Sequence, residues 1–241
     1  MAVSLYDGSS SLLSRLLQGQ LVLRTISAIV LAPLVLYVIY EGGVVFDLLT
    51  ISIALLALHE WLGIVTQHEC ESYTSCEKLK YRWHIGGVVA TVFLACSLIF
   101  IRNSSDHGYH HTLWLVLVVW ATDVGAYFSG MVIGGPKIAP SISPKKTWSG
   151  AVGGLVFACI VGVIFNYLFG DHGCVEYLIL SPILSVISQI GDLLESRFKR
   201  VFNVKDSGHV IPGHGGILDR IDGLATASIF FALILFFKLV V

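Results

Sequence analysis

Charged residues are scarce in this sequence. They make up 13% of its 241 residues, against about 25% in a typical soluble protein. Hydrophobic residues account for 55%, and the mean hydropathy is +0.81. These values exclude an ordinary soluble domain, because the apolar residues also form runs long enough to cross a bilayer, which takes about 20 residues. The sequence has no basic cluster interleaved with aromatic residues, so we expect no nucleic-acid partner.

Cysteine is present, but not in a pattern that builds a site. The cysteines are odd in number and show no framework spacing, which argues against a disulfide scaffold. Their positions are Cys70, Cys76, Cys96, Cys159 and Cys174. The first two, with His68 beside them, fit none of the usual zinc-ligand spacings. We therefore expect neither a disulfide framework nor a zinc site.

The apolar residues are grouped into several long runs. They cover approximately residues 21–40, 44–66, 85–101, 111–133, 150–169, 175–191 and 221–241. The first run is too long for a signal peptide and lacks a small-residue cleavage pattern, so we expect it to remain as a membrane span. No internal repeat, low-complexity tract or interdomain linker is visible. The sequence therefore predicts an all-α polytopic transmembrane bundle of about seven spans, with an N-terminal segment over 1–20 and one transmembrane domain over 21–241.

The basic residues predict the orientation of this bundle. If the N-terminus is cytoplasmic, only Arg102 and Lys238 of the 15 Lys and Arg residues lie on the opposite side. Enrichment of basic residues in cytoplasmic loops is the rule for membrane proteins. The predicted cytoplasmic connections, at 67–84, 134–149 and 192–220, are also the longer and more polar ones. Because loops on a rigid scaffold often carry functional residues, we expect the functional site on the cytoplasmic side.

Glycines recur at a four-residue spacing within one predicted span and across the end of another. The pairs are Gly130 with Gly134 and Gly150 with Gly154. Small residues at this spacing let membrane helices approach closely. We expect them to pack helices within one chain, with contact between two chains as the alternative.

The stretch from Gln189 to Gly223 combines carboxylates, cations and a glycine-rich turn. Asp219 and Asp222 stand three apart, so on a helix they share one face. Carboxylate oxygens at a membrane boundary suit a hard cation such as Mg²⁺, which binds one or two carboxylates together with substrate phosphates. Basic side chains and the backbone N–H groups of the turn, Pro212 to Gly216, suit phosphate oxygens. The combination indicates phosphoryl or nucleotidyl transfer.

Each of these elements also has a simpler explanation. Either aspartate is a plausible cap for a helix N-terminus. The basic residues Arg197, Lys199 and Arg200 also fit cytoplasmic anchoring, and the glycine-rich stretch fits an ordinary turn. Only their occurrence together within one stretch favours a catalytic site.

The same stretch resembles the signature of the phosphatidate cytidylyltransferase family, the CDP-diacylglycerol synthases. The matching positions are Ser196, Lys199, Arg200, Lys205, Asp206, Ser207, Pro212, Gly213, His214, Gly215, Gly216, Leu218, Asp219, Arg220 and Asp222. Three upstream blocks are also similar, at 123–130, 140–148 and 191–193, so that the resemblance covers about 123–223. Met131 and Ser149 depart from the family pattern, which often has a basic and an acidic residue at these positions.

The resemblance implies a divalent-metal site, with Mg²⁺ as the expected cofactor. The implied ligands are Asp192, Asp219 and Asp222, with Asp123 as a weaker fourth. The three first-named aspartates, Lys205 and Arg220 are the implied catalytic residues. The implied substrate-binding residues are Ser143, Lys145, Lys146, Thr147, Ser196, Lys199, Arg200, Asp206, His214, Gly215 and Gly216.

Other polar residues have structural interpretations. Glu60 lies near the cytoplasmic end of the second predicted span, where we expect a structural or interfacial role. Asp123 has the alternative of a buried polar residue bonded to a neighbouring span. We expect His214 to bind phosphate or fix the turn rather than act as a base. The remaining histidines of interest belong to a predicted outer loop without carboxylates, where solvated side chains are expected, and they are His107, His110 and His111.

The reaction that the resemblance implies joins CTP to phosphatidate and yields CDP-diacylglycerol and pyrophosphate. It also implies contact with membrane lipid, a homodimer, and an active site facing the cytoplasm, and the compact chain fits a bacterial inner membrane. A multispan transporter is one alternative, but it predicts polar residues at several span centres, whereas here they gather at span ends. A lipid kinase with CTP as phosphoryl donor remains a second alternative. A CDP-alcohol phosphotransferase needs a D-G-x2-A-R element, which the sequence lacks.

Overall fold

The described part of the chain is almost entirely helical. The structure is a computed structural model that describes residues 20–67, 73–104, 107–169, 176–208 and 215–240, with side chains omitted at 20–28, 73–76, 78 and 239–240. Its helices are α2 (Gln20–Glu41), α3 (Gly43–Gln67), α4 (Tyr73–Asn103), α5 (Gly108–Val132), α6 (Trp148–Phe169), α7 (Glu176–Val201) and α8 (Leu218–Val240). Within the described residues, 6 helices, α3 to α8, are long and apolar enough to cross a membrane. The described side chains of α2 form a shorter apolar helix, Ile29–Glu41.

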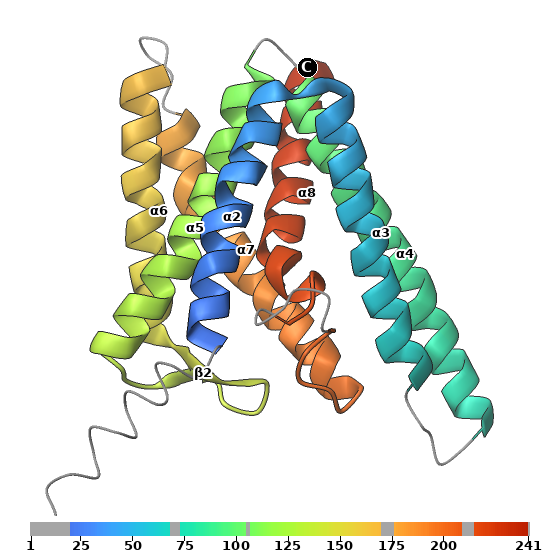
Figure 1. Cartoon of the computed structure of the whole chain (residues 1–241). Coiled ribbons are helices and arrows are strands. Elements are labelled where there is room, and N and C mark those ends of the chain that lie inside the picture. Colours follow the sequence, from blue (N-terminus) through green and yellow to red (C-terminus); the bar gives the residue numbers. More distant parts are fainter. Residues whose placement is uncertain (1–19, 68–72, 105–106, 170–175, 209–214, 241) are drawn as a thin grey trace, which may run out of the picture.

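Consecutive helices of the bundle run in alternating directions (Figure 1). The C-terminal ends of α2, α4 and α8 lie at one end of the bundle, and the hairpin strand β2 lies at the other. The main helix pairs are α5 with α6, α7 with α8, and α3 with α4. This alternation confirms the predicted all-α bundle, while its orientation in a membrane stays a prediction.

The α5–α6 pair is close because glycines line its contact. A Cβ atom added at Gly150 would lie 2.8 Å from the carbonyl oxygen of Ala126, and one at Gly154 would lie 2.8 Å from that of Thr122. Only glycine lets the two backbones approach this closely. The expected packing of Gly150 and Gly154 within one chain is confirmed.

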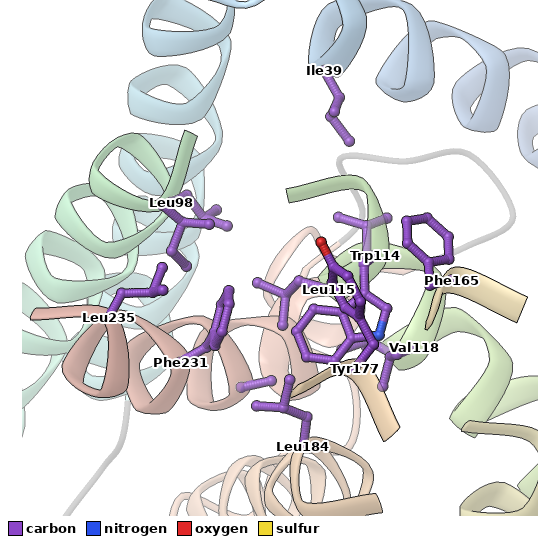
Figure 2. Packing of buried hydrophobic residues seen from close by; sticks show 14 of the residues in the cluster. Ile39, Leu98, Trp114, Leu115, Val118, Phe165, Tyr177, Leu184, Phe231 and Leu235 are labelled. Carbon is purple, nitrogen blue, oxygen red and sulfur yellow. The ribbon is translucent and has the colours of Figure 1, made fainter. Parts of the chain in front are cut away.

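The centre of the bundle is an apolar cluster around α5 (Figure 2). Trp114 and Leu115 of α5 are fully buried and belong to one cluster with Leu184 of α7 and Phe231 of α8. Polar side chains inside this region are paired between helices. The indole N–H of Trp114 donates to Ser181 Oγ at 3.0 Å, and Thr122 Oγ1 donates to Ser185 Oγ at 3.0 Å. Such bonds satisfy hydroxyl groups that would otherwise be buried without partners.

All three connections predicted on the cytoplasmic side contain regular structure. Helix α4 already begins at Tyr73, within the connection predicted over 67–84. The connection between α5 and α6 carries an antiparallel hairpin of β1 (Lys137–Ala139) and β2 (Ser143–Thr147). Helix α7 continues to Val201, ten residues beyond the predicted end of its span at 191. The extension is stabilised by the i,i+4 pair of Glu195 with Lys199 and by the buried ring of Phe198, which stacks on Trp61 of α3 at 3.7 Å between centroids.

Candidate active site

Three carboxylates from two helices meet at the end of the bundle that carries the hairpin. Asp192 and Glu195 of α7 and Asp222 of α8 each offer an oxygen, and these oxygens lie within 4.8 Å of one another. The two α7 residues are three apart and therefore share a face. Gly191 brings α8 against this face, because a Cβ there would lie 2.9 Å from the carbonyl oxygen of Asp222. The arrangement can hold a hard divalent cation.

Two lysines neutralise part of this cluster. Lys146 of β2 pairs with Asp192 at 2.5 Å. Lys199 of α7 bridges Glu195 at 2.8 Å and Asp219 of α8 at 2.6 Å. In their ionised forms the two lysines balance two of the four carboxylates of Asp192, Glu195, Asp219 and Asp222, and two negative charges remain. That excess favours a cation.

Asp219 has different partners from Asp222, although the two share one helix. One oxygen of Asp219 accepts the bond from Lys199. The other accepts the backbone N–H groups of Ser207 at 3.0 Å and Gly216 at 3.2 Å. Asp219 therefore ties both ends of the segment 207–216 to α8. Its predicted metal role stays a prediction, whereas Asp192 and Asp222 do lie together.

Asp123 and Arg220 lie near the same cluster. Asp123 of α5 interacts electrostatically with Asp192, Lys146 and Arg220. Asp123 presents surface to the outside of the chain, and its metal role and the alternative of a polar residue bonded to a neighbouring span both stay predictions. Asp123 is not among the three residues whose oxygens converge.

Of the hairpin residues predicted to bind substrate, Lys146 contacts a carboxylate of the cluster. Lys146 reaches Asp192, whereas Lys145 is exposed and Ser143 is half-buried. Thr147 is buried and caps α6, since its hydroxyl accepts the N–H of Gly150 at 3.1 Å. The hairpin thus supplies a lysine to the site and fixes the start of α6.

The signature residues after the cluster are divided between α7 and the chain that follows it. Ser196 is half-buried on α7, while Lys205 and Asp206 are exposed. The guanidinium of Arg200 donates to the carbonyl oxygens of Ile142 at 3.2 Å and Val204 at 3.0 Å, so it joins the hairpin to the end of α7. These positions stay predicted substrate-binding residues.

The glycine-rich turn is described only from Gly215. Gly215 has φ +81°, a left-handed conformation that favours glycine. A Cβ on Gly216 would lie 2.5 Å from a carboxylate oxygen of Glu60, so no larger residue fits there. His214, with a predicted phosphate or turn role, lies outside the described residues.

Two carboxylates were not assigned to the site from sequence. Glu195 was missed because the sixth predicted span ends at 191 and leaves Glu195 in the predicted connection 192–220, although its i+3 spacing from Asp192 was a usable signal. Glu60 was given a structural or interfacial role, and the structure shows it buried, with 5% of its surface exposed. Its carboxylate accepts three hydrogen bonds from Ser207, Ile217 and Leu218.

The remaining histidines and cysteines form no site among the described residues. His110 and His111 belong to α5 rather than to a loop, and His111 is half-buried between Tyr177 and Phe231. The solvated-loop expectation was wrong for His111, because α5 starts earlier than predicted, at Gly108. The cysteines with described side chains, Cys96 and Cys159, are free, and the rejected zinc group, Cys70 with Cys76 and His68, lies outside the side chains that the structure describes.

A mostly apolar cavity of about 450 Å³ adjoins the carboxylates. Its walls come from α3, α4, α7 and α8, with Trp61, Trp83 and Leu194 among the apolar lining. Glu195 of α7 and Asp222 of α8 also line the cavity. One space therefore connects an apolar lining to two of the three converging carboxylates.

The chain is similar to known proteins over most of its length. Residues 74–238 match the model of the cytidylyltransferase family. The chain is 36% identical over 241 aligned residues to a protein of Brucella suis biovar 1, covering 85% of this chain and 89% of that protein. It is 35% identical over 223 residues to a protein of Rickettsia conorii, covering 88% of this chain and 90% of that protein. It is 49% identical over 138 residues to a protein of Haemophilus influenzae, covering 55% of this chain and 48% of that protein. All three are named phosphatidate cytidylyltransferase. A match across residues 74–238 and relatives aligned over most of their length show that this chain belongs to the cytidylyltransferase family.

Proposed function

We propose that this chain is a membrane-embedded CTP:phosphatidate cytidylyltransferase, which forms CDP-diacylglycerol and pyrophosphate. The observation that carries the proposal is the convergence of Asp192, Glu195 and Asp222 beside an apolar cavity that Glu195 and Asp222 line, in a chain of this family. A water-soluble nucleotide and a lipid must meet at one place, and this place offers charge and apolar surface together. The relatives support the same substrates through their names.

The residues at the cluster fit a divalent cation. Glu195 Oε1 is buried and accepts no hydrogen bond from any described residue. Oxygen donors from three carboxylates, with two negative charges left over, suit Mg²⁺ better than a softer metal. We assign Asp192, Glu195 and Asp222 as its holders, with Asp219 and Asp123 as further candidates. When bound, the ion would neutralise CTP phosphates and the charge that develops on the leaving pyrophosphate.

In the proposed reaction a phosphate oxygen of phosphatidate attacks the α-phosphorus of CTP in line. A new P–O bond forms, the bond from the α-phosphorus to the bridging oxygen breaks, and its electrons leave with pyrophosphate. Phosphatidate needs no strong base, because a phosphate monoester with a second pKa near 6 is largely dianionic at neutral pH. The protein's part is therefore positioning and charge neutralisation.

Basic side chains of the hairpin and of α7 would hold the phosphates. Lys146 and Lys199 already lie at the carboxylates. Lys145, Lys205 and Arg220 are exposed at the same end of the chain, where phosphates would approach from the aqueous side. We assign them to the triphosphate and to the phosphatidate headgroup.

The cavity suggests how the lipid is accommodated. Acyl chains would stay in apolar surroundings along Trp61, Trp83 and Leu194 while the headgroup reaches Glu195 and Asp222. The site would face the cytoplasm of a bacterial cell, as the distribution of basic residues supports. A homodimer in the inner membrane is the assembly that we expect for this enzyme.

The test uses purified protein in detergent with phosphatidate, Mg²⁺ and CTP labelled at the α-phosphate. We expect label to move into the organic phase as a CDP-lipid and the transfer to stop with EDTA. Absence of transfer by folded protein would overturn the proposal. In that case γ-labelled CTP distinguishes a lipid kinase, which moves the γ-phosphate, and vesicle uptake distinguishes a transporter.

A further inference from the structure

Glu60 is the buried acid of α3 that the proposed chemistry does not use. It lies in an apolar helix with 5% of its surface exposed, and none of the described basic residues forms an ion pair with it. A carboxylate in such a place needs other compensation. Its partners are donors of the signature region, 147 to 158 residues further along the chain.

Both oxygens of Glu60 hold the start of α8. Oε1 accepts the backbone N–H of Ile217 at 2.9 Å, and Oε2 accepts that of Leu218 at 2.9 Å. These N–H groups have no partner within the helix, and Ile217, at the N-cap position, has no side-chain oxygen to accept one. Glu60 therefore supplies from another helix the cap that the local sequence lacks. Its negative charge also suits the positive end of the α8 dipole.

Glu60 also holds the chain before the glycine-rich segment. Ser207 Oγ donates to Oε2 at 3.1 Å. A Cβ on Gly208 would lie 2.7 Å from Oε1, and one on Gly216 would lie 2.5 Å from Oε2, so the backbone on both sides of the segment closes around this carboxylate. The backbone that precedes the segment 209–214 and the backbone that follows it therefore both pack against Glu60.

We propose that Glu60 is a positioning residue for cytidylyl transfer, which fixes the start of α8 and the two ends of the glycine-rich segment. Asp219 and Asp222 lie in the first turns of the helix that Glu60 caps. Their placement against Glu195 and Lys199 therefore depends on a residue that touches neither substrate nor metal. The expected change in kinetics rests on the proposed function, whereas the expected change in hydrogen exchange does not.

The variant Glu60→Gln tests this with little change in size. The amide keeps one oxygen and turns the other acceptor into an NH₂ donor, which cannot accept from Ile217, Leu218 or Ser207. We expect kcat/KM for CTP to fall about tenfold or more, with the KM for CTP raised. The matched control is Glu77→Gln, the same change at an exposed acid of α4. It should leave the kinetics unchanged.

Hydrogen exchange gives a readout that needs no substrate. In Glu60→Gln the amides of Ile217 and Leu218 should exchange about tenfold faster or more, while amides of α5 and α6 keep their protection. This comparison holds even if the wild type transfers no cytidylyl group, so failure of the proposed function is distinguishable from failure of this inference. Unchanged exchange at these amides would overturn the positioning role.

A purely structural role predicts a different result. It would lower the yield of folded protein or the unfolding temperature and leave the KM of the folded fraction unchanged, which would overturn the proposal. If Glu60→Gln does not fold, Glu60→Asp carries the test, because its shorter side chain keeps the charge but cannot reach all three donors. Folded Glu60→Asp should show a smaller rise in KM and in exchange than Glu60→Gln; wild-type values for both would equally overturn it.

Discussion

Replacement of Gly191 by alanine should separate the two helices that carry the converging carboxylates. The added Cβ would lie 2.1 Å from Thr226 Oγ1 and 2.9 Å from the carbonyl oxygen of Asp222, whereas ordinary contact begins at 3.4 Å. Rotation of Thr226 can relieve the first contact at the loss of its hydrogen bond to the carbonyl oxygen of Ile187. The second is backbone, so α7 and α8 must move apart by roughly half an ångström.

The displacement acts on Asp192 and Asp222 directly, because Gly191 neighbours one and contacts the other. A misplacement of about 1 Å can cost a hundredfold in rate, so half of that should lower turnover about tenfold. Overpacking should also lower the free energy of unfolding by about 1–3 kcal/mol. Turnover is measured with α-labelled CTP, and stability by thermal unfolding in the same detergent.

The control for this substitution is Gly63→Ala in α3, where an added Cβ meets nothing within 4 Å. It should keep wild-type turnover. The double variant Gly191→Ala with Thr226→Ala should recover part of the lost activity, because the side-chain contact disappears and the backbone contact stays. Wild-type turnover in Gly191→Ala alone would refute the argument that helix spacing sets the geometry of the site.

Two further predictions concern the charges of the cluster. Lys199→Met leaves Glu195 and Asp219 without their shared cation, and all three side chains are at most 12% exposed. The free energy of unfolding, measured by denaturant titration, should therefore fall by about 3 kcal/mol. An unchanged midpoint of unfolding would contradict a stabilising role for this ion pair. Glu195→Gln should raise the Mg²⁺ concentration for half-maximal activity of the folded protein about tenfold, and an unchanged metal titration would remove Glu195 from the ligand set.

The spans and the main carboxylates were predictable because they depend on local pattern. Apolar runs located α3, α5, α6 and α8 to within a few residues. The motif around Asp192 and Asp222 was recognisable because its residue types and their spacing match the family signature. Membrane helices leave few places for charges, so charges that do occur at span ends carry strong information.

Contacts between distant helices were not predictable in the same way. The bond from Ser207 to Glu60 spans 147 residues, and no periodicity in the sequence aligns the two. The end of α7 was placed too early because hydropathy drops at Asp192, although the helix continues to Val201 on intrahelical pairs and the Phe198 contact. The same early end concealed Glu195. Hydropathy reports the membrane boundary, whereas the helix ends where its packing ends.

The structure gives different partners to Asp219 and Asp222, which the sequence treats alike. Asp219 accepts two backbone N–H groups and one lysine, whereas Asp222 converges with Asp192 and Glu195. In Asp219→Asn the side-chain NH₂ group, a donor, should therefore face either Lys199 or the N–H groups of Ser207 and Gly216. Hydrogen exchange at the amides of Ser207 and Gly216 should accelerate, and turnover should be lost. Asp222→Asn should lower turnover at least a hundredfold, with no change in hydrogen exchange at the amides of Ser207 and Gly216. Identical exchange patterns in the two variants would show that both aspartates act in the same way, and the division between a residue that holds the loop and a residue that holds the metal would be wrong.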